Sequence, residues 1–353
     1  MVRLSKKGEK IRQFILENIE NNPHNIANNT AKQFDVSCHA INKHIQHLIK
    51  QGALIKEGKT KNVKYRLHPQ EEWTTSLDLA TNYSEDVIWR NEISPELGVL
   101  PDNTINIWHY GFTEMFNNVI DHSESKTVLI GIRKTSPSTE MIISDTGIGI
   151  FNKIKSKMGL LDSRQAVVEL TKGKLTTDPD HHTGEGIFFT SRMFDEFGIL
   201  SGDVYLSHKY GKEEDWILET TKNNSGTYIT MKLKNNTART TKEVFDKFSA
   251  DGNFGFTKTI VPVRLAQYGN EQLISRSQAK RLLDRVDRFK VVILDFNEVE
   301  SIGQAFADEI FRVFIKQHPQ IRIIPLNEND NITQTIKKVQ SYEEALTENN
   351  QNP

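Results

Sequence analysis

A helical pattern near the middle of the chain has an unusual polar side. Over residues 112–121 apolar and polar positions recur three and four apart, which predicts a helix with two opposite sides. The polar side carries short, acceptor-rich side chains and lacks the lysines of an ordinary solvated surface. It consists of Glu114, Asn117, Asn118 and Asp121, whereas the apolar side consists of Phe112, Met115, Phe116 and Val119.

Two glycine-rich segments follow this helix, at residues 145–149 and 183–186. The first comes after two β-rich runs, 128–134 and 141–144, which are predicted as sheet strands at hairpin spacing. The second precedes a helix that we expect over 187–197. Both glycine segments indicate backbone close to a ligand, and the glycines before the helix would also expose backbone N–H groups to an anion.

The N-terminal residues combine helical and strand patterns. Helices are predicted over 6–22 and 25–34, and a third begins at an N-cap, Ser37. Strand patterns at 53–55 and 63–67 follow, with a polar turn between them. Three helices and a β-hairpin in this order resemble the winged helix-turn-helix, in which the third helix recognises DNA and the hairpin is the wing.

That resemblance implies DNA as a partner. Residues 1–68 hold thirteen Lys or Arg against five Asp or Glu, while the whole chain has a net charge of −1. Exposed polar side chains there could bind base edges and phosphates, although a protein-interaction module with solvated lysines is the alternative. The candidate DNA-binding residues are His39, Asn42, Lys43 and Gln46 on the third helix and Lys59 and Lys61 on the wing.

The C-terminal part alternates between helix and strand patterns. A helix is predicted over 277–288, a buried strand over 291–296, an amphipathic helix over 305–316 and a strand over 321–325. This alternation predicts a small α/β layer structure. The segment 294–303 resembles the STAS domain of anti-sigma antagonists, particularly the STAS-like domain found beside GHKL ATPases.

The STAS resemblance is incomplete at one functional position. Where the antagonists carry a phosphorylatable serine, this chain has Gln304-Ala305, and Ser301 is displaced. The resemblance therefore implies docking of a protein partner or a regulatory role rather than phosphorylation in cis.

Composition narrows the class of protein. The 353 residues, 37% hydrophobic and 26% charged, suit a soluble protein of two or three domains. Because Cys38 is the single cysteine, an internal disulfide is excluded, and the sequence contains no cysteine motif for a zinc cluster. No apolar run approaches the roughly 20 residues that cross a bilayer, and no signal-peptide core is present, so we expect a cytoplasmic protein without membrane contact.

The three central segments occur in an order that resembles the GHKL ATP-binding fold, or Bergerat fold. DNA gyrase, the MutL mismatch-repair ATPases, Hsp90, sensor histidine kinases and anti-sigma-factor kinases share this fold. Residues 114–122 look like its N box, 145–150 like its first glycine box and 183–187 like its second. Gly226-Thr227 looks like its closing Gly-Thr, so the resemblance covers roughly residues 96–235.

The GHKL resemblance implies ATP and Mg²⁺ as ligands. Asn118 would hold Mg²⁺ against the phosphates, since this hard ion takes oxygen ligands and keeps several waters. Glu114 would be the catalytic base, and Asp145 would accept a hydrogen bond from the adenine amino group. Lys172 or Lys174 could reach a phosphate from a lid, or belong to a solvated loop. The remaining candidate nucleotide-binding residues are Asn117, Asp121, Gly147, Gly149, Thr183, Gly184, Gly186 and Thr227.

These patterns predict an α+β multidomain protein. A winged helix-turn-helix is expected over 1–68, a connector with one or two helices over 69–95, and a GHKL α/β sandwich with helices over a mixed sheet over 96–238. A STAS-like domain is expected over 250–343, followed by a disordered tail over 344–353. A homodimer is compatible with this organisation.

Several functions fit the sequence. The leading hypothesis is a DNA-binding transcriptional regulator whose state is set by Mg-ATP and by the STAS-like domain. Such a switch requires the ligand to have different affinities for the two states. The alternative is an anti-sigma-type serine kinase or a slow ATPase that acts on a protein partner, with Glu114 as the base. An adaptor that binds nucleotide without turnover is a third hypothesis.

Overall fold

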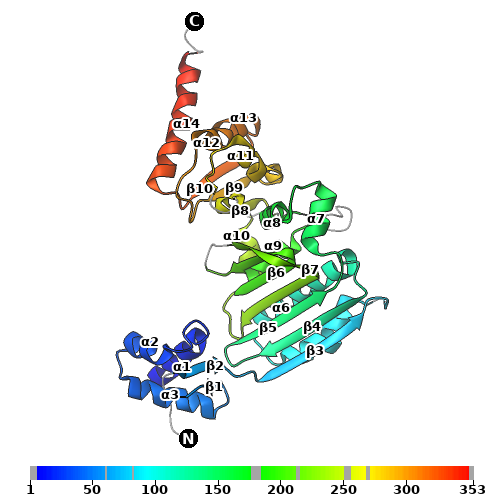
Figure 1. The fold of residues 1–353 in the computed structure, drawn as a ribbon, viewed down its shortest axis with the longest axis vertical. Coiled ribbons are helices and arrows are strands. Elements are labelled where there is room, and N and C mark those ends of the chain that lie inside the picture. Colours follow the sequence, from blue (N-terminus) through cyan, green and yellow to red (C-terminus); the bar gives the residue numbers. More distant parts are fainter. Residues whose placement is uncertain are drawn as a thin grey trace.

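The structure, a computed structural model, has a mixed α+β architecture. Three units follow one another along the chain: an N-terminal helical unit, a central unit on a five-stranded sheet and a C-terminal unit on a three-stranded sheet (Figure 1). Within the described part of the chain, none of the helices is long and apolar enough to cross a membrane. The described residues are 6–59, 62–81, 83–175, 184–211, 215–249, 256–267 and 271–349.

The N-terminal unit contains three helices and an antiparallel hairpin, in the order predicted from the sequence. The predicted N-cap is confirmed, because the Ser37 hydroxyl accepts a hydrogen bond from the Ala40 N–H at 3.2 Å. The first helix ends four residues earlier than expected, in a turn before Pro23. The elements are α1 Lys6–Asn18, α2 Ile26–Phe34, α3 Cys38–Lys50, β1 Leu54–Glu57 and β2 Lys64–Leu67.

The central sheet has the strand order β3-β4-β5-β7-β6. Every pairing in it is antiparallel, so the expectation of a mixed sheet is wrong. The reason is that β7 lies between β5 and β6 and pairs antiparallel with both, so that β5 and β6 run in the same direction without touching. The strands are β3 Glu71–Asp78, β4 Thr127–Lys134, β5 Ser138–Asp145, β6 Glu196–Lys209 and β7 Asp215–Lys234.

Strand β3 corrects a second expectation. The sequence indicated a connector with helices, whereas Glu71–Asp78 is an edge strand in register with β4, Trp73 opposite Ile132 and Leu77 opposite Val128. Its exposed and half-buried positions alternate, as they do in a strand with one covered face. The expected helices follow it, as α4 Glu85–Ile88, a π-helical turn Trp89–Ile93 and α5 Ser94–Leu97.

Helices cover one face of the central sheet (Figure 1). The long helix α6, Asp102–His122, buries its apolar side, including Phe112, Met115 and Phe116, which are fully buried. The helix expected over 187–197 ends earlier, because Glu196 already belongs to edge strand β6. The other helices are α7 Ile150–Met158, α8 Ser163–Lys172, α9 Gly186–Met193 and α10 Thr241–Lys247.

The C-terminal unit is a parallel sheet with the order β10-β9-β8, accompanied by helices. The predicted strands over 291–296 and 321–325 are confirmed within one residue at each end. The helix predicted over 305–316 is confirmed too, with a π-helical stretch, Glu309–Phe314, inside it. The elements are β8 Lys258–Pro262, α11 Arg276–Leu283, β9 Val291–Asp295, α12 Gln304–Asp308, α13 Ile315–Gln317, β10 Arg322–Leu326 and α14 Asp330–Asn349.

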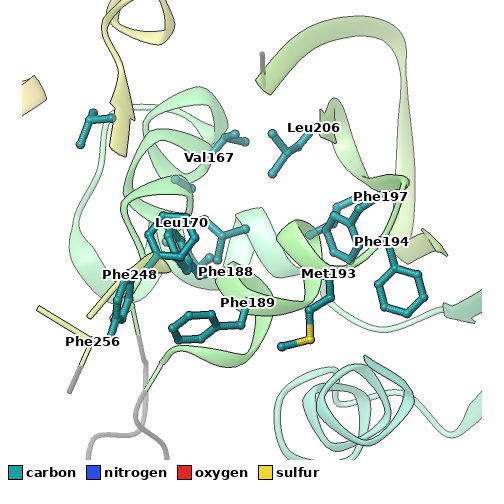
Figure 2. Packing of buried hydrophobic residues seen from close by; sticks show 14 of the residues in the cluster. Val167, Leu170, Phe188, Phe189, Met193, Phe194, Phe197, Leu206, Phe248 and Phe256 are labelled. Atoms are coloured by element: carbon teal, nitrogen blue, oxygen red, sulfur yellow. The ribbon is translucent and has the colours of Figure 1, made fainter. Parts of the chain in front are cut away.

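Buried apolar side chains join the central and C-terminal units into one core. Phe256, just before β8, packs against Phe188 and Phe189 of α9, with ring centroids 4.5 and 4.9 Å apart. Figure 2 shows these rings gathered with Phe248 beside the α8 side chains Val167 and Leu170. Within the described residues, the N-terminal unit has a separate apolar cluster of its own.

Candidate functional site

A cavity of about 300 Å³ lies between α6 and the elements that face it. Residues from separated segments line it, namely from α6, the end of β5, α7, α8, the start of α9 and β7. One part of the wall is apolar, formed by Val119, Ile150, Ile154, Ile187 and Ile229, and also by Leu170 and Leu175. Its candidate polar and glycine residues are Glu114, Asn117, Asn118, Asp145, Gly184, Gly186 and Thr227.

Asp145 is the buried acid of the cavity, with 4% of its surface exposed. Burial raises the pKa of this carboxyl, while hydrogen bonds from Gly147 and Thr227 oppose the rise. The Gly147 N–H donates to Asp145 Oδ1 at 2.8 Å. An ionised carboxylate has about four acceptor positions, so Asp145 can still accept a hydrogen bond from a ligand that lies against the apolar wall.

Glu114 lies against the first residue of α9. A Cβ atom added to Gly186 would be 1.9 Å from Glu114 Oε2, so any larger residue at this position would displace the Glu114 carboxylate. Glu114 and Asn118 are one turn apart on α6 and both line the cavity. The carboxylate and the amide therefore face the same space, together with the N-terminal end of α9.

Several candidates lie outside the cavity lining. Gly147 packs against the backbone of Ser123, and Gly149 has φ +81° beside Ser201, so both glycines serve the path of the chain itself. Asp121 is exposed on the last turn of α6. Thr183 falls outside the described residues, and so does Lys61 of the wing.

The two candidate lid lysines lie against the C-terminal unit. The Lys174 amine donates to the Arg288 carbonyl at 3.2 Å and lies 5.0 Å from the centre of the Phe289 ring. Burial lowers the pKa of Lys174, and the nearby Glu185 opposes this shift. Lys172 is almost fully buried, with its amine 2.6 Å from Glu169 Oε1. Neither lysine lines the cavity.

One cation in the cavity wall, Lys153 of α7, was not among the residues expected from the sequence. Its amine donates to the His122 carbonyl at 2.7 Å and lies 3.6 Å from Glu124 Oε1. It thus bridges the start of α7 and the last turn of α6, on either side of the cavity. A lysine four residues after Gly149, on the first turns of a helix, was the signal that could have identified it.

The candidate DNA-binding residues of the third helix form one exposed surface. His39, Asn42, Lys43 and Gln46 are exposed on α3, while Ile41, Ile45 and Leu48 on its opposite side are buried. Lys59 is exposed in the turn of the hairpin. On strand β2, Lys64 forms an ion pair with Glu57 at 2.9 Å, which reduces the positive charge that the hairpin offers.

Comparison with known protein families gives one match. Residues 278–333 match a family model described as a STAS-like domain of unknown function (DUF4325). These residues run from α11 to the start of α14, so the STAS-like prediction is confirmed for this part of the C-terminal unit. None of the curated proteins matches the chain.

Proposed function

We propose that this chain is an ATP-binding regulatory protein, a DNA-binding transcriptional regulator whose state is set by Mg-ATP in the cavity and by the STAS-like domain. The observation that carries the proposal is the cavity itself. It brings together Glu114 and Asn118, Asp145, Gly186 and Thr227, which come from four separate segments and which the GHKL resemblance assigns to one nucleotide site.

The cavity residues fit Mg-ATP chemically. The apolar wall suits a flat base, and the buried Asp145 carboxylate suits an exocyclic amino group that donates a hydrogen bond. Asn118 offers an amide oxygen of the kind that Mg²⁺ accepts beside phosphate oxygens. When bound, Mg-ATP would supply a phosphoryl group that can be sensed or transferred.

Binding to DNA is supported by the exposed polar surface of α3. Four side chains that can bind bases or phosphates lie on one side of that helix, in the part of the chain where thirteen Lys or Arg face only five Asp or Glu. An electrophoretic mobility assay on genomic fragments should detect this binding. Exchange of Asn42 and Lys43 for alanine should abolish the shift, whereas Lys242→Ala on α10, far along the chain, should leave it intact.

ATP binding is tested by titration calorimetry with Mg-ATP. Asp145→Asn should weaken binding at least about tenfold, because the amide cannot accept from Gly147, Thr227 and the adenine amino group together. Glu140→Gln on the same strand, outside the cavity lining, is the matched control. If Asp145→Asn bound Mg-ATP with normal affinity, the proposal that Asp145 accepts a hydrogen bond from the adenine amino group would be wrong.

The second candidate function is a serine kinase or a slow ATPase. It is favoured by one observation, the Glu114 carboxylate in the cavity one turn from Asn118, where a base could take a proton from water or from a hydroxyl. Incubation with γ-labelled ATP separates the possibilities. Label on a protein indicates a kinase, free phosphate alone an ATPase, and neither product a switch or an adaptor. Glu114→Ala should abolish turnover and retain ATP binding.

A further inference from the structure

The last residue of α8 and the three residues that follow it contact two parts of the molecule at once. We call residues 172–175 the coupling segment. Leu175 lines the cavity, and its N–H donates to the Gly184 carbonyl at 3.0 Å, next to Gly186 in the same cavity wall. Lys172 and Lys174, at alternating positions, bind the C-terminal unit.

Lys172 forms the most buried of these contacts. Its amine donates to the Asp284 carbonyl at 2.8 Å and to the Arg281 carbonyl at 3.2 Å, at the C-terminal end of α11. Glu169, one turn back on α8, neutralises the ammonium at 2.6 Å. A cation at a helix C-terminus satisfies carbonyls that have no partner within the helix, so the amine closes the last turn of α11 from outside.

Backbone groups of the coupling segment are held as well. The Thr259 hydroxyl of β8 donates to the Lys172 carbonyl at 2.6 Å. Lys174 and Arg288 exchange two bonds, since the Lys174 amine donates to the Arg288 carbonyl and the Arg288 guanidinium donates to the Lys174 carbonyl at 2.7 Å. The segment is thus bonded to the C-terminal unit on both sides of Gly173, through Lys172 and through Lys174.

Gly173 is packed tightly against two aromatic rings. It has φ +81°, and a Cβ atom there would lie 2.6 Å from the Phe256 ring and 3.0 Å from the Phe188 ring. Phe188 belongs to α9, whose first residue lies against Glu114, and Phe256 leads into the C-terminal unit. A displacement of the segment would therefore also displace side chains of α9 and of the C-terminal unit.

We propose that the coupling segment links occupancy of the cavity to docking of the C-terminal unit, so that the STAS-like unit is held more firmly when the cavity is filled. The identity of the filling ligand, Mg-ATP, rests on the function proposed above. A ligand that orders Leu175 and Gly184 in the cavity wall also fixes Lys172 and Lys174 against α11 and Arg288. By reciprocity, releasing the C-terminal unit must weaken ligand binding by the same factor.

The buried ion pair makes this link close to all-or-none. If Lys172 moved away from the α11 carbonyls while Glu169 stayed in place, the Glu169 carboxylate would remain buried without its cation, which is strongly unfavourable. Partial displacement is therefore disfavoured, and the pair either stays in place or moves out together. A two-state contact of this kind can transmit ligand binding over the distance between the two units.

The test compares the full chain with the double variant Glu169→Gln/Lys172→Met, which removes both charges and leaves neither partner alone. Lys242→Met, which breaks an exposed pair with Asp246 on α10, is the matched control. Titration with Mg-ATP measures affinity, and hydrogen exchange of residues 276–284 with and without Mg-ATP measures docking. Thr259→Val, which loses one bond to the segment and keeps its shape, serves as a second, milder variant.

The expected result is slower exchange in α11 of the native chain when Mg-ATP is present. In the double variant, affinity should fall about tenfold and the effect of Mg-ATP on α11 should vanish, with a smaller fall in Thr259→Val and none in Lys242→Met. If the native chain binds Mg-ATP while α11 exchange and the affinities of both variants stay unchanged, the link is overturned and the proposed function stands. If the native chain does not bind Mg-ATP, both proposals fall.

Discussion

The two ends of the molecule are attached to the central unit by different kinds of contact. At the N-terminal junction, Lys232 of β7 pairs with Glu20 at 2.5 Å and Lys234 pairs with Glu17 at 3.8 Å. Both glutamates are partly exposed. At the C-terminal junction, the aromatic rings around Phe256 belong to one continuous core, and the charged side chain of Lys172 is buried as well.

This difference separates a movable contact from a cooperative one. Exposed ion pairs contribute little and weaken with salt, so the N-terminal unit can leave the sheet at a small cost in free energy. A shared apolar core resists separation, because each part would expose buried rings. We therefore expect the central and C-terminal units to unfold together and the N-terminal unit to unfold by itself.

The largest effect is expected from Phe256→Ala. Removing this ring leaves a cavity between Phe188, Phe189 and Phe289, and should lower the free energy of unfolding by about 4 kcal/mol. Urea denaturation followed by tryptophan fluorescence measures it, since the four tryptophans lie outside the N-terminal unit. Ile15→Ala, in the separate N-terminal cluster, is the counterpart and should leave that transition in place. Equal shifts in the two variants would contradict the comparison.

The next effect is expected from Lys172→Met. The variant leaves the Glu169 carboxylate buried without its cation, which should cost about 3 kcal/mol in the same transition. Adding Glu169→Gln to it should restore most of this loss, because no unpaired buried charge remains. A double variant as unstable as the single one would show that packing rather than charge holds this junction.

The smallest effect is expected from Lys232→Ala, about 0.2–1 kcal/mol, because Glu20 is half exposed. Burial opposes a charged Lys232, but the hydrogen bond to Glu20 and nearby carboxylates outweigh it and raise the pKa above its usual 10.5. The contribution is therefore complete below pH 10.5 and is lost as pH rises through the folded-state pKa. Limited proteolysis between α3 and β3 should accelerate in the variant and in high salt, but not in Lys242→Ala.

Elements with strong local signals were predictable from the sequence. The Ser37 cap of α3 needs a hydroxyl residue before a helix, and β9 needs a run of four apolar residues before Asp295. The polar side of α6 was predictable too, because helix geometry alone places Glu114 and Asn118 together. In each case the deciding residues lie within one or two turns of one another.

Features that depend on distant partners were not predictable. The sequence of β3 resembles a polar connector, because an edge strand with one covered face needs few apolar residues, here Trp73 and Leu77. Its pairing partner, β4, begins only at Thr127. Lys172 reads as a solvated or phosphate-binding lysine, because the carbonyls that bury its amine follow 109 and 112 residues later. No local sequence pattern predicts that β7 lies between β5 and β6.

The link between β2 and β3 has a mechanical consequence. Only residues 68–70 separate the hairpin of the N-terminal unit from the edge of the central sheet, so the four steps from Leu67 to Glu71 reach at most about 14 Å. Both ends are fixed, since the His68 N–H donates to the Ala53 carbonyl and the Gln70 N–H to the Lys134 carbonyl. Once its ion pairs break, the N-terminal unit can pivot about this point but cannot drift away. In any assembly of this chain, the spacing between two such units would follow from the positions of the sheet edges rather than from the length of a flexible tether.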